Sequence, residues 1–344
     1  MYLNWALGLR ALGCQVIWLE VVDRSVAPGV TRERAAALRS QLEGFGLAQS
    51  LALEPKVEGY LDLDAAAEAD LVLDLGYCAE TEMVRRFRKS ALVDIDPGLT
   101  QCWISEGQMA VAPHDVYFTI GETVGTPAAR FPDCGLRWHY TPPPIFIPAW
   151  SVAPVPAEAP YTTVSSWWGN WVLRGGESYS NEKRSAFLDY VELPSRICPR
   201  LELAIALGEV EEERRFLERH GWIVRDALEV SATADQYRAY IRKSRGEFSC
   251  AKPSCTRLAT AWISDRTVCY LATGKPAVVQ HTGPSRFLPD AEGLFRFHNV
   301  DEAAAALEAV EADYERHARA ARALAEEHFD AEKVLTRVLE RVAP

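Results

Sequence analysis

Hydrophobic and polar positions follow two alternating patterns along the first part of the chain. Leucines recur at helical spacing over residues 3–12, and a short continuous apolar run follows over 15–20. The first pattern predicts a helix, and the second predicts a buried strand of a parallel sheet. The alternation continues, with helices expected over 31–46 and 80–89 and strands over 69–76, 91–98 and 116–121. It predicts a parallel α/β domain.

Seven prolines between Thr141 and Pro160 interrupt this pattern. Proline lacks a backbone N–H and fixes φ, so such a stretch forms neither a regular helix nor a central strand. We interpret it as the connection between two domains, 1–150 and 151–320. Beyond it, strands are expected over 161–166, 201–207, 222–224 and 275–280, and helices over 180–190, 209–220, 233–243 and 264–272. From Asp301 to Val342 the pattern is almost entirely helical, with a break near Asp330.

Length and composition agree with a two-domain globular protein. The chain has 344 residues, of which 48% are hydrophobic and 25% are charged. Its formal net charge of −11 argues against non-specific binding of nucleic acid, which needs a basic surface, but permits a local basic pocket for a phosphate group. No apolar run approaches the roughly 20 residues of a membrane-spanning helix.

The eight cysteines are scattered and form no C-x-x-C pair, so zinc-ribbon and thioredoxin-type sites have no support. We interpret them as small buried hydrophobic residues of a protein in the reducing cytoplasm. No secretory signal precedes the first helix, and no histidine or acidic spacing indicates a metal site.

The segment 261–280 carries the strongest candidate chemistry. Ser264 suits a helix N-cap, Asp265 suits the first turn, and Gly274 ends the helix before Pro276 enters a strand. The polar turn over residues 264–267 offers free backbone N–H groups and hydroxyls at the positive end of a helix, which suits a diphosphate. For the turn taken alone, simple helix capping is the favoured interpretation.

This helix, followed by Gly274-Lys275-Pro276 and an apolar strand, resembles the donor-site signature of nucleotide-sugar glycosyltransferases of the GT-B fold, similar to bacterial families 1 and 4. Segments 247–252, 280–283 and 290–294 resemble the neighbouring loops, and Ser180-Asn181-Glu182-Lys183 resembles the start of the first donor-domain helix, with a phosphate-binding lysine. The resemblance covers nearly the whole chain and is closest from 161 to 300.

The resemblance implies an α/β GT-B architecture, with two Rossmann-like domains facing a central cleft and the C-terminal helix, 321–344, crossing back to the first domain. It implies transfer of a sugar from a nucleoside-diphosphate sugar, such as a UDP-sugar, to a small-molecule or lipid-linked cell-envelope acceptor. The donor is then a co-substrate and no cofactor or metal is needed. A homodimer is compatible with it, whereas nucleic acid and an integral membrane segment are not expected.

Donor-site candidates fall into three groups. Lys183, Lys252 and Arg266 are the cations that would stabilise the departing nucleoside diphosphate, although Arg266 could instead pair with Asp265 or Glu247. The helix start supplies Ser264, Asp265 and Thr267. His281 follows the last donor-domain strand, where members of the family often hold sugar hydroxyls.

A tryptophan-rich run over residues 165–171 follows the first strand of the second domain. Trp167, Trp168 and Trp171, around the expected Gly169-Asn170 turn, could form an aromatic wall for a sugar or an apolar acceptor. Packing in the core between the domains is the alternative interpretation.

A general base that removes the acceptor proton is expected in the first domain if the enzyme inverts the anomeric centre. The candidates are polar residues near strand ends, namely Asp96, His114, Asp115 and Glu122, with Asp94 beside them. Asp96 precedes a proline and could simply begin a turn.

Two departures from the family pattern leave alternatives open. Many relatives have a ribose-binding glutamate five residues before the helix-ending glycine, where this chain has Cys269. The usual first strand and its glycine-rich loop are also expected to be missing, because Met1 already lies at the first helix. A non-catalytic partner or scaffold protein, or a nucleotide-sugar epimerase of the same architecture, remains an alternative.

Overall fold

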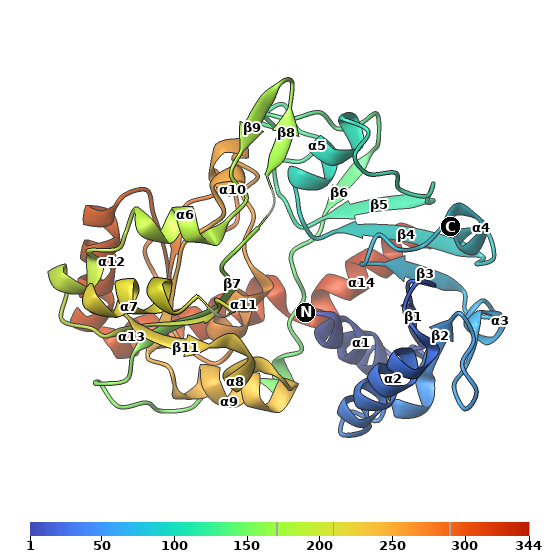
Figure 1. Cartoon of the computed structure of the whole chain (residues 1–344), viewed down its shortest axis with the longest axis horizontal. Coiled ribbons are helices and arrows are strands. Elements are labelled where there is room, and N and C mark those ends of the chain that lie inside the picture. The colour runs from blue at the N-terminus through green and yellow to red at the C-terminus, as the bar shows by residue number, and fades with distance from the viewer. Residues whose placement is uncertain (170, 209, 289, 344) are drawn as a thin grey trace.

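Two parallel α/β halves lie side by side in the computed structural model of the chain (Figure 1). The structure describes residues 1–169, 171–208, 210–288 and 290–343. Within them the expected fold class is confirmed: helices alternate with short strands, and each half has its own parallel sheet.

The N-terminal half contains a four-stranded sheet in the order β3-β4-β5-β6 and a separate parallel pair, β1-β2. Its strands are β1 (Trp18–Val21), β2 (Leu51–Glu54), β3 (Leu71–Asp74), β4 (Lys89–Asp94), β5 (Val116–Thr119) and β6 (Trp138–Tyr140). Its helices are α1 (Tyr2–Ala11), α2 (Pro28–Glu43), α3 (Leu63–Ala66), α4 (Thr81–Val84) and α5 (Leu99–Ser105).

The C-terminal half is a six-stranded parallel sheet in the order β11-β10-β7-β12-β13-β14. Its strands are β7 (Tyr161–Ser166), β10 (Leu201–Ala206), β11 (Ile223–Asp226), β12 (Gly246–Ser249), β13 (Ala277–Gln280) and β14 (Leu294–Phe297). The helices around it are α6 (Lys183–Leu188), α7 (Glu211–Arg219), α8 (Ala227–Ser231), α9 (Ala234–Lys243), α10 (Pro253–Leu258), α11 (Asp265–Ala272) and α12 (Val300–Ala312). Stacked rings of Phe248 and Phe297 lie in its core, with centroids 5.4 Å apart.

The chain crosses between the halves twice, and the two crossings touch. The first is the proline-rich segment, whose regular structure is limited to a 3-10 turn over Ile147–Ala149. The second follows α13 (Tyr314–Leu324) and a π-helical turn, η4 (Ala325–Phe329), and leads into α14 (Ala331–Val342). Ile145 N donates to Phe329 O at 2.7 Å, and Ala331 N donates to Ile145 O at 2.9 Å.

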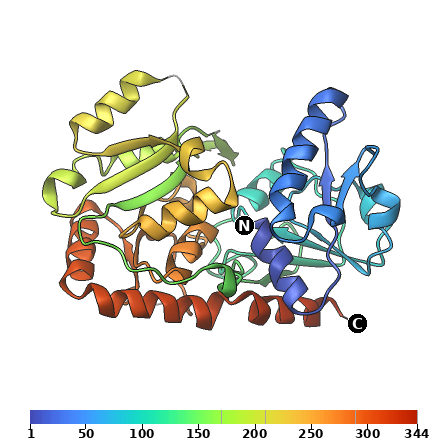
Figure 2. The same cartoon turned by 90° about the horizontal axis from the view of Figure 1, so that it is seen from below.

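Helix α14 packs on the N-terminal half. Leu335 and Val338 are buried in one cluster with Trp5 and strand β4, and Figure 2 shows the C-terminal helices running along one side of both halves. A Cβ at Gly8 of α1 would lie 2.6 Å from the side chains of Ala331 and Leu335, so only glycine permits this close approach. The C-terminal helix therefore returns to the first half; Pro344, the last residue of the expected segment 321–344, lies outside the described residues.

Several expected boundaries are wrong. The helix expected over 80–89 is only α4, because the chain turns over an arginine-rich segment and β4 already begins at Lys89. In that segment Arg86 and Arg88 pair with Asp64 and Asp70 rather than continuing a helix. Glu209, expected to begin the helix that the structure shows as α7, lies outside the described residues.

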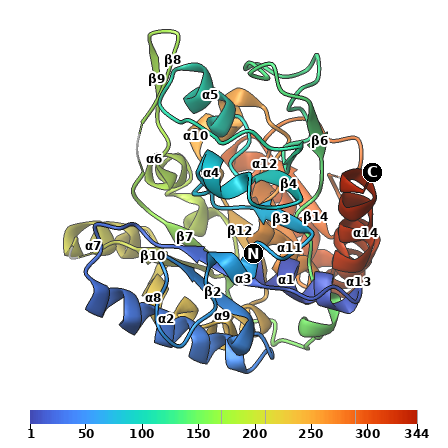
Figure 3. The same ribbon diagram turned by 90° about the vertical axis from the view of Figure 1, so that its right-hand side faces the viewer.

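The antiparallel hairpin β8 (Val172–Arg174) and β9 (Glu177–Tyr179) was not expected from the sequence. It belongs to the C-terminal half but lies beside α5 of the N-terminal half, as Figure 3 shows. Val172 is buried in the N-terminal cluster that contains Leu92 and Leu99, so the hairpin is a further contact between the halves.

Candidate functional site

The carboxyl ends of the two sheets meet where the halves face each other. Gly121, just beyond β5, forms an antiparallel backbone bridge with Trp262, and Thr123 N donates to Thr260 O at 3.3 Å. The Thr123 hydroxyl also donates to Ala259 O at 3.1 Å. Ligands of open parallel sheets bind outside the carboxyl ends of the strands, so this junction is the candidate site.

Lys183 is a buried cation at this junction. It is the first residue of α6, is 5% exposed, and donates from Nζ to the carbonyl of Cys250, which follows β12. Its Nζ lies 6.0 Å from the centroid of the Trp262 ring. Burial, assisted by the charge of Arg266, lowers the pKa of Lys183 to about 7. Among the described residues, no acidic side chain forms an ion pair with this amine.

Lys183 opens onto a small cavity of about 20 Å³. The polar groups that line it come from β12, the loops after β12 and β13, and the start of α11; they include Ser249, Ser264, Thr267, Gln280 and Thr282. Sites for small molecules and cofactors occupy roughly 300–1,000 Å³, so a nucleotide can enter only after these loops or the two halves have moved apart.

Lys252 and Asp96 face each other from opposite halves. Lys252 is the N-cap residue of α10, and its Nζ lies 3.9 Å from Asp96 Oδ1. The two side chains are 28% and 39% exposed. Asp96 N donates to Asp94 Oδ1 at 3.1 Å, and Asp94 is fully buried and accepts from Gln101. Burial raises the pKa of Asp94. Asp94 therefore holds the loop, while Asp96 remains within reach of a ligand.

Helix α11 begins as expected, with the Ser264 hydroxyl accepting from Arg266 N at 3.2 Å. Asp265 lies in the first turn, 3.4 Å from the amino group of Met1. Thr267 is buried and lines the small cavity. Three residues of the polar turn line the cavity, namely Ser264, Arg266 and Thr267, whereas Asp265 points a negative charge elsewhere.

Arg266 forms an ion pair with Glu247 of its own half. This pairing is the alternative to phosphate binding that the sequence left open. Its guanidinium donates to Glu247 at 2.6 Å, to Ser249 at 2.6 Å and to Val164 O at 3.0 Å. Glu247 is 0% exposed, so this buried ion pair ties α11 to strands β7 and β12. Although Arg266 lines the cavity, each of its three guanidinium nitrogens already donates to a protein group, which favours a positioning role over phosphate binding.

Glu122 lies at the junction, but both of its carboxylate oxygens are occupied. They accept from Ser285 Oγ at 2.7 Å, from Arg286 N at 2.9 Å and from Arg286 Nε at 2.9 Å. The side chain is 3% exposed. In this arrangement Glu122 joins the two halves and is not free to act as a base.

His114 and Asp115 lie away from the junction, unlike the other candidates. Asp115 accepts from Ser90 N at 2.8 Å and from Ser90 Oγ at 3.0 Å, so it lies at the amino end of β4, opposite the junction. The side chain of His114 is 0% exposed; its Nδ1 lies 2.7 Å from Ala112 O and its Nε2 3.7 Å from Asp74. Neither residue reaches the carboxyl ends of the strands.

The tryptophan run divides between core and surface. Trp167 is 0% exposed and stacks on Phe187 with centroids 5.9 Å apart, so it belongs to the core and not to an aromatic wall. Trp168 is 45% exposed and lies 5.7 Å from the Arg184 guanidinium. Asn170 of the expected turn lies outside the described residues.

His281 and Cys269 have different surroundings. The His281 ring stacks on His298 with centroids 4.4 Å apart, and its Nδ1 accepts from Gly283 N at 3.1 Å. Burial lowers the pKa of His281, with Arg296 contributing. Cys269 is 2% exposed and packs in the core around α11, so it cannot contact a ribose.

The sequence interpretation missed Trp262 and the loop around it. Thr282 Oγ1 donates to Trp262 O at 2.5 Å, and Ala259 and Ala261 both have φ of +53°. Non-glycine residues with positive φ are uncommon and concentrate at functional loops. A Cβ at Gly283 would lie 2.6 Å from Ala259 O. An aromatic residue directly before the capping turn was the available signal.

The described residues hold no candidate metal-binding group and no candidate membrane-spanning helix. In these parts of the chain, no group of three or more histidine, cysteine, aspartate and glutamate side chains could hold a metal ion. None of the helices in residues 1–169, 171–208, 210–288 and 290–343 is long and apolar enough to cross a membrane.

Similar structures were found only at low sequence identity. No protein-family model and no curated protein matches the chain. HepE of Anabaena in complex with UDP-glucose has a TM-score of 0.55 and 11% identity, covering 95% of this chain and 99% of that chain. An α-glucosyltransferase in complex with UDP and a 13-mer DNA has a TM-score of 0.55 and 10% identity, with the same coverage.

A further structure of the α-glucosyltransferase, in complex with UDP, has a TM-score of 0.55 and 9% identity, covering 99% of this chain and 94% of that chain. These likenesses extend over both halves. They identify the architecture as the GT-B fold, as the resemblance of the sequence implied.

Proposed function

We propose that the protein is a glycosyltransferase that moves a sugar from a nucleoside-diphosphate sugar, UDP-linked in our interpretation, to an acceptor bound against the N-terminal half. The observation that carries this proposal is Lys183, a buried amine at the carboxyl end of the C-terminal sheet, whose hydrogen-bond partner is a backbone carbonyl. Support comes from the GT-B fold and from the UDP or UDP-glucose in the similar structures.

The chemistry required is stabilisation of a departing diphosphate. Lys183 and Lys252 would both place positive charge at the junction from the C-terminal half, and the start of α11 adds backbone N–H groups beside Ser264. Charge that develops on the leaving group is stabilised by such preorganised donors. Because burial disfavours the charged form of Lys183, a bound diphosphate would draw a proton onto this amine.

Asp96 is the base that we propose for an inverting reaction. Of the acidic candidates, Asp94 and Glu122 are buried and bonded, whereas Asp96 is 39% exposed at the junction. A carboxylate there can accept the acceptor's hydroxyl proton once Lys252 turns to the diphosphate. The contact between Lys252 and Asp96 would then be exchanged for contacts with substrates.

We also propose the class of acceptor, independence from metal ions and the cellular location. The acceptor is a small molecule or a lipid-linked molecule, and lysines supply the positive charge that a metal supplies in other transferases. The eight cysteines, all in described parts of the chain, are free thiols, which supports a reducing cytoplasmic location.

A non-catalytic nucleotide-binding or partner role is the second candidate. It is favoured by the ion pair that occupies Glu122 and by the 20 Å³ volume beside Lys183. A protein of this kind would bind a nucleoside diphosphate and transfer no sugar.

Titration calorimetry with UDP, GDP and ADP tests the donor site, and transfer or hydrolysis of the matching nucleotide sugar tests turnover. Lys183→Met should bind about ten- to a hundredfold more weakly, whereas Lys243→Met, at an exposed lysine of α9, should bind like the wild type. If none of the nucleotides binds to the wild-type protein, the donor-site proposal is refuted. Binding without turnover across a panel of acceptors would select the second candidate.

A further inference from the structure

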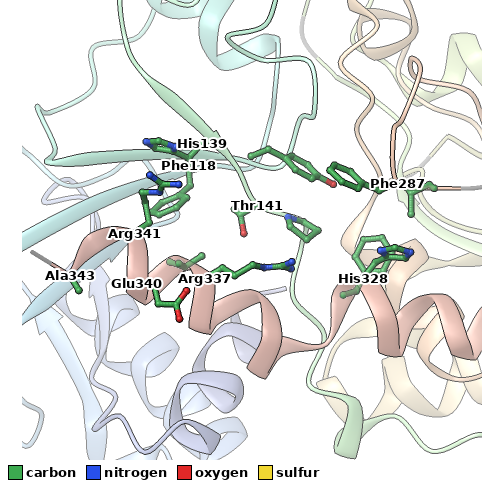
Figure 4. A pocket seen from close by; sticks show the side chains of 14 residues that line it. Phe118, His139, Thr141, Phe287, His328, Arg337, Glu340, Arg341 and Ala343 are labelled. Carbon is green, nitrogen blue, oxygen red and sulfur yellow. The ribbon is translucent and has the colours of Figure 1, made fainter.

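A second, much larger cavity of about 750 Å³ lies between the halves and has no lining residue in common with the cavity at Lys183. Its walls are β5 and β6 with the segment that follows, the loop after β13, η4 and helix α14 (Figure 4). Tyr140 and Thr141 place it at the carboxyl end of the edge strand β6. We call it the α14 groove.

The charge of the α14 groove is positive in an otherwise acidic protein. Arg337 and Arg341 stand one turn apart on α14, are exposed, and have no acidic partner among the described residues. Figure 4 shows Arg341 directed toward Phe118 and His139, while the carboxylate of Glu340 points away from both guanidinium groups. Like charges at this spacing repel each other, so a bound anion would relieve an unfavourable interaction.

Two histidines, His139 and His328, also line the groove. Burial lowers the pKa of His139, with Arg341 and Arg137 contributing, which favours the neutral form of its ring. His328 lines the groove from η4, on the side toward Phe287 in Figure 4. The fixed positive charge in the groove therefore comes from Arg337 and Arg341.

An aromatic wall faces these charges. Tyr140 of the N-terminal half and Phe287 of the C-terminal half are stacked, with ring centroids 5.8 Å apart and planes at 4°. Phe287 is 46% exposed, and Phe118 lines the same space. The groove thus combines a polar, cationic side with an apolar one, and its volume falls in the range of sites for small organic molecules.

We propose that the α14 groove binds the phosphate group of a phosphorylated organic molecule, with Arg337 and Arg341 on the phosphate and the Tyr140–Phe287 pair against its apolar part. Arginine suits this ligand because its planar fork of N–H donors matches two phosphate oxygens. The site is distinct from the proposed donor site, and its existence does not depend on that assignment.

Titration calorimetry of the full chain with phenyl phosphate tests this site. We expect binding that is about tenfold weaker in Arg337→Gln and in Arg341→Gln, because each loses a charge-assisted contact. The matched control is Arg319→Gln, which removes an exposed arginine of α13 outside the groove and should bind like the wild type. The arginines at 337 and 341 are exposed, so both variants should keep the fold, and circular dichroism checks this.

Co-sedimentation with vesicles of phosphatidylcholine, with and without phosphatidic acid, distinguishes the two sources of the phosphate. Binding that needs phosphatidic acid and is lost in the same two variants assigns the groove to a lipid phosphate. Binding of phenyl phosphate alone assigns it to a soluble ester. The proposal is overturned if neither probe binds, or if all three variants bind as the wild type does.

Discussion

Replacing Lys183 by methionine should stabilise the protein and weaken its binding of nucleotide. Methionine keeps the length of the side chain but removes an amine that is 5% exposed. Lowering of its pKa from 10.5 to about 7 means that burial disfavours the charged form by roughly 5 kcal/mol. In the unfolded chain the lysine is solvated and this cost is absent, so the wild-type residue lowers the free energy of unfolding.

The size of the gain depends on pH. Near pH 7 the unfolded chain keeps the proton of Lys183 and half of the folded molecules have lost it, which costs about 4 kcal/mol. Loss of the hydrogen bond to the carbonyl of Cys250 offsets about 1 kcal/mol of the gain. The net stabilisation of about 3 kcal/mol corresponds to a rise in Tm of roughly 4 °C for a chain of this length.

The sign of the pH dependence follows from the lowered pKa. In the wild type, the unfolded state binds more protons than the folded state between about pH 7 and 10.5, so this lysine makes stability rise with pH in that window. The advantage of the variant is therefore full below pH 7 and disappears toward pH 10.5. Urea unfolding of both proteins at several pH values measures it.

The same variant should bind UDP about ten- to a hundredfold more weakly, because a charge-assisted contact with the diphosphate is lost. A higher free energy of unfolding together with weaker binding of UDP would indicate that this buried amine lowers stability but serves ligand binding. The reasoning is refuted if Lys183→Met unfolds at the same or lower urea concentration at every pH and binds UDP like the wild type.

Three further substitutions test individual assignments. Asp96→Asn should bind UDP within about twofold of the wild type but lower sugar transfer by about a hundredfold or more, so unchanged turnover in a coupled UDP-release assay would reject Asp96 as the base. Arg266→Met should lower the free energy of unfolding by about 3–5 kcal/mol, because it leaves the buried Glu247 unpaired, and a loss below about 1 kcal/mol in urea titration would contradict the positioning role. Trp167→Ala should cost about 3–5 kcal/mol and Trp168→Ala much less, and similar losses in calorimetric melting would show that the division between core and surface is wrong.

The sequence predicts the architecture of the fold better than it predicts where each helix begins and ends. Short apolar runs with prolines between two sets of them indicated two parallel α/β halves, because burial on both faces of a sheet requires continuous apolar strands. The lengths of the helices are predicted less well, as the segment 80–89 shows. Helix α4 ends at Val84, and Arg86 and Arg88 just beyond it pair with Asp64 and Asp70, contacts that the spacing of residues does not reveal.

The sequence predicts which helix or strand end carries each candidate residue, but it does not predict which partner each side chain contacts. The sequence placed Lys183 at the start of a helix and Lys252 and Asp96 near strand ends, and the structure shows Lys252 and Asp96 facing each other across the junction. Whether a charged side chain is available depends on its partners in space. Arg266 and Glu122 lie at the right ends of their elements, yet each is occupied by residues distant in sequence.

The hydrogen bonds that Ile145 makes with Phe329 and Ala331 determine how the halves can move. Both covalent connections pass through this one point, so together they act as a hinge rather than as two separate tethers. Swinging about it opens the carboxyl ends of the sheets, whereas sliding would break both backbone bonds. Proteolysis within 151–160 would separate the chain into two fragments, which would stay together through the non-covalent packing of α14 on the N-terminal half. Such a nicked protein should still open and close, because its axis of rotation is formed by the second crossing as well.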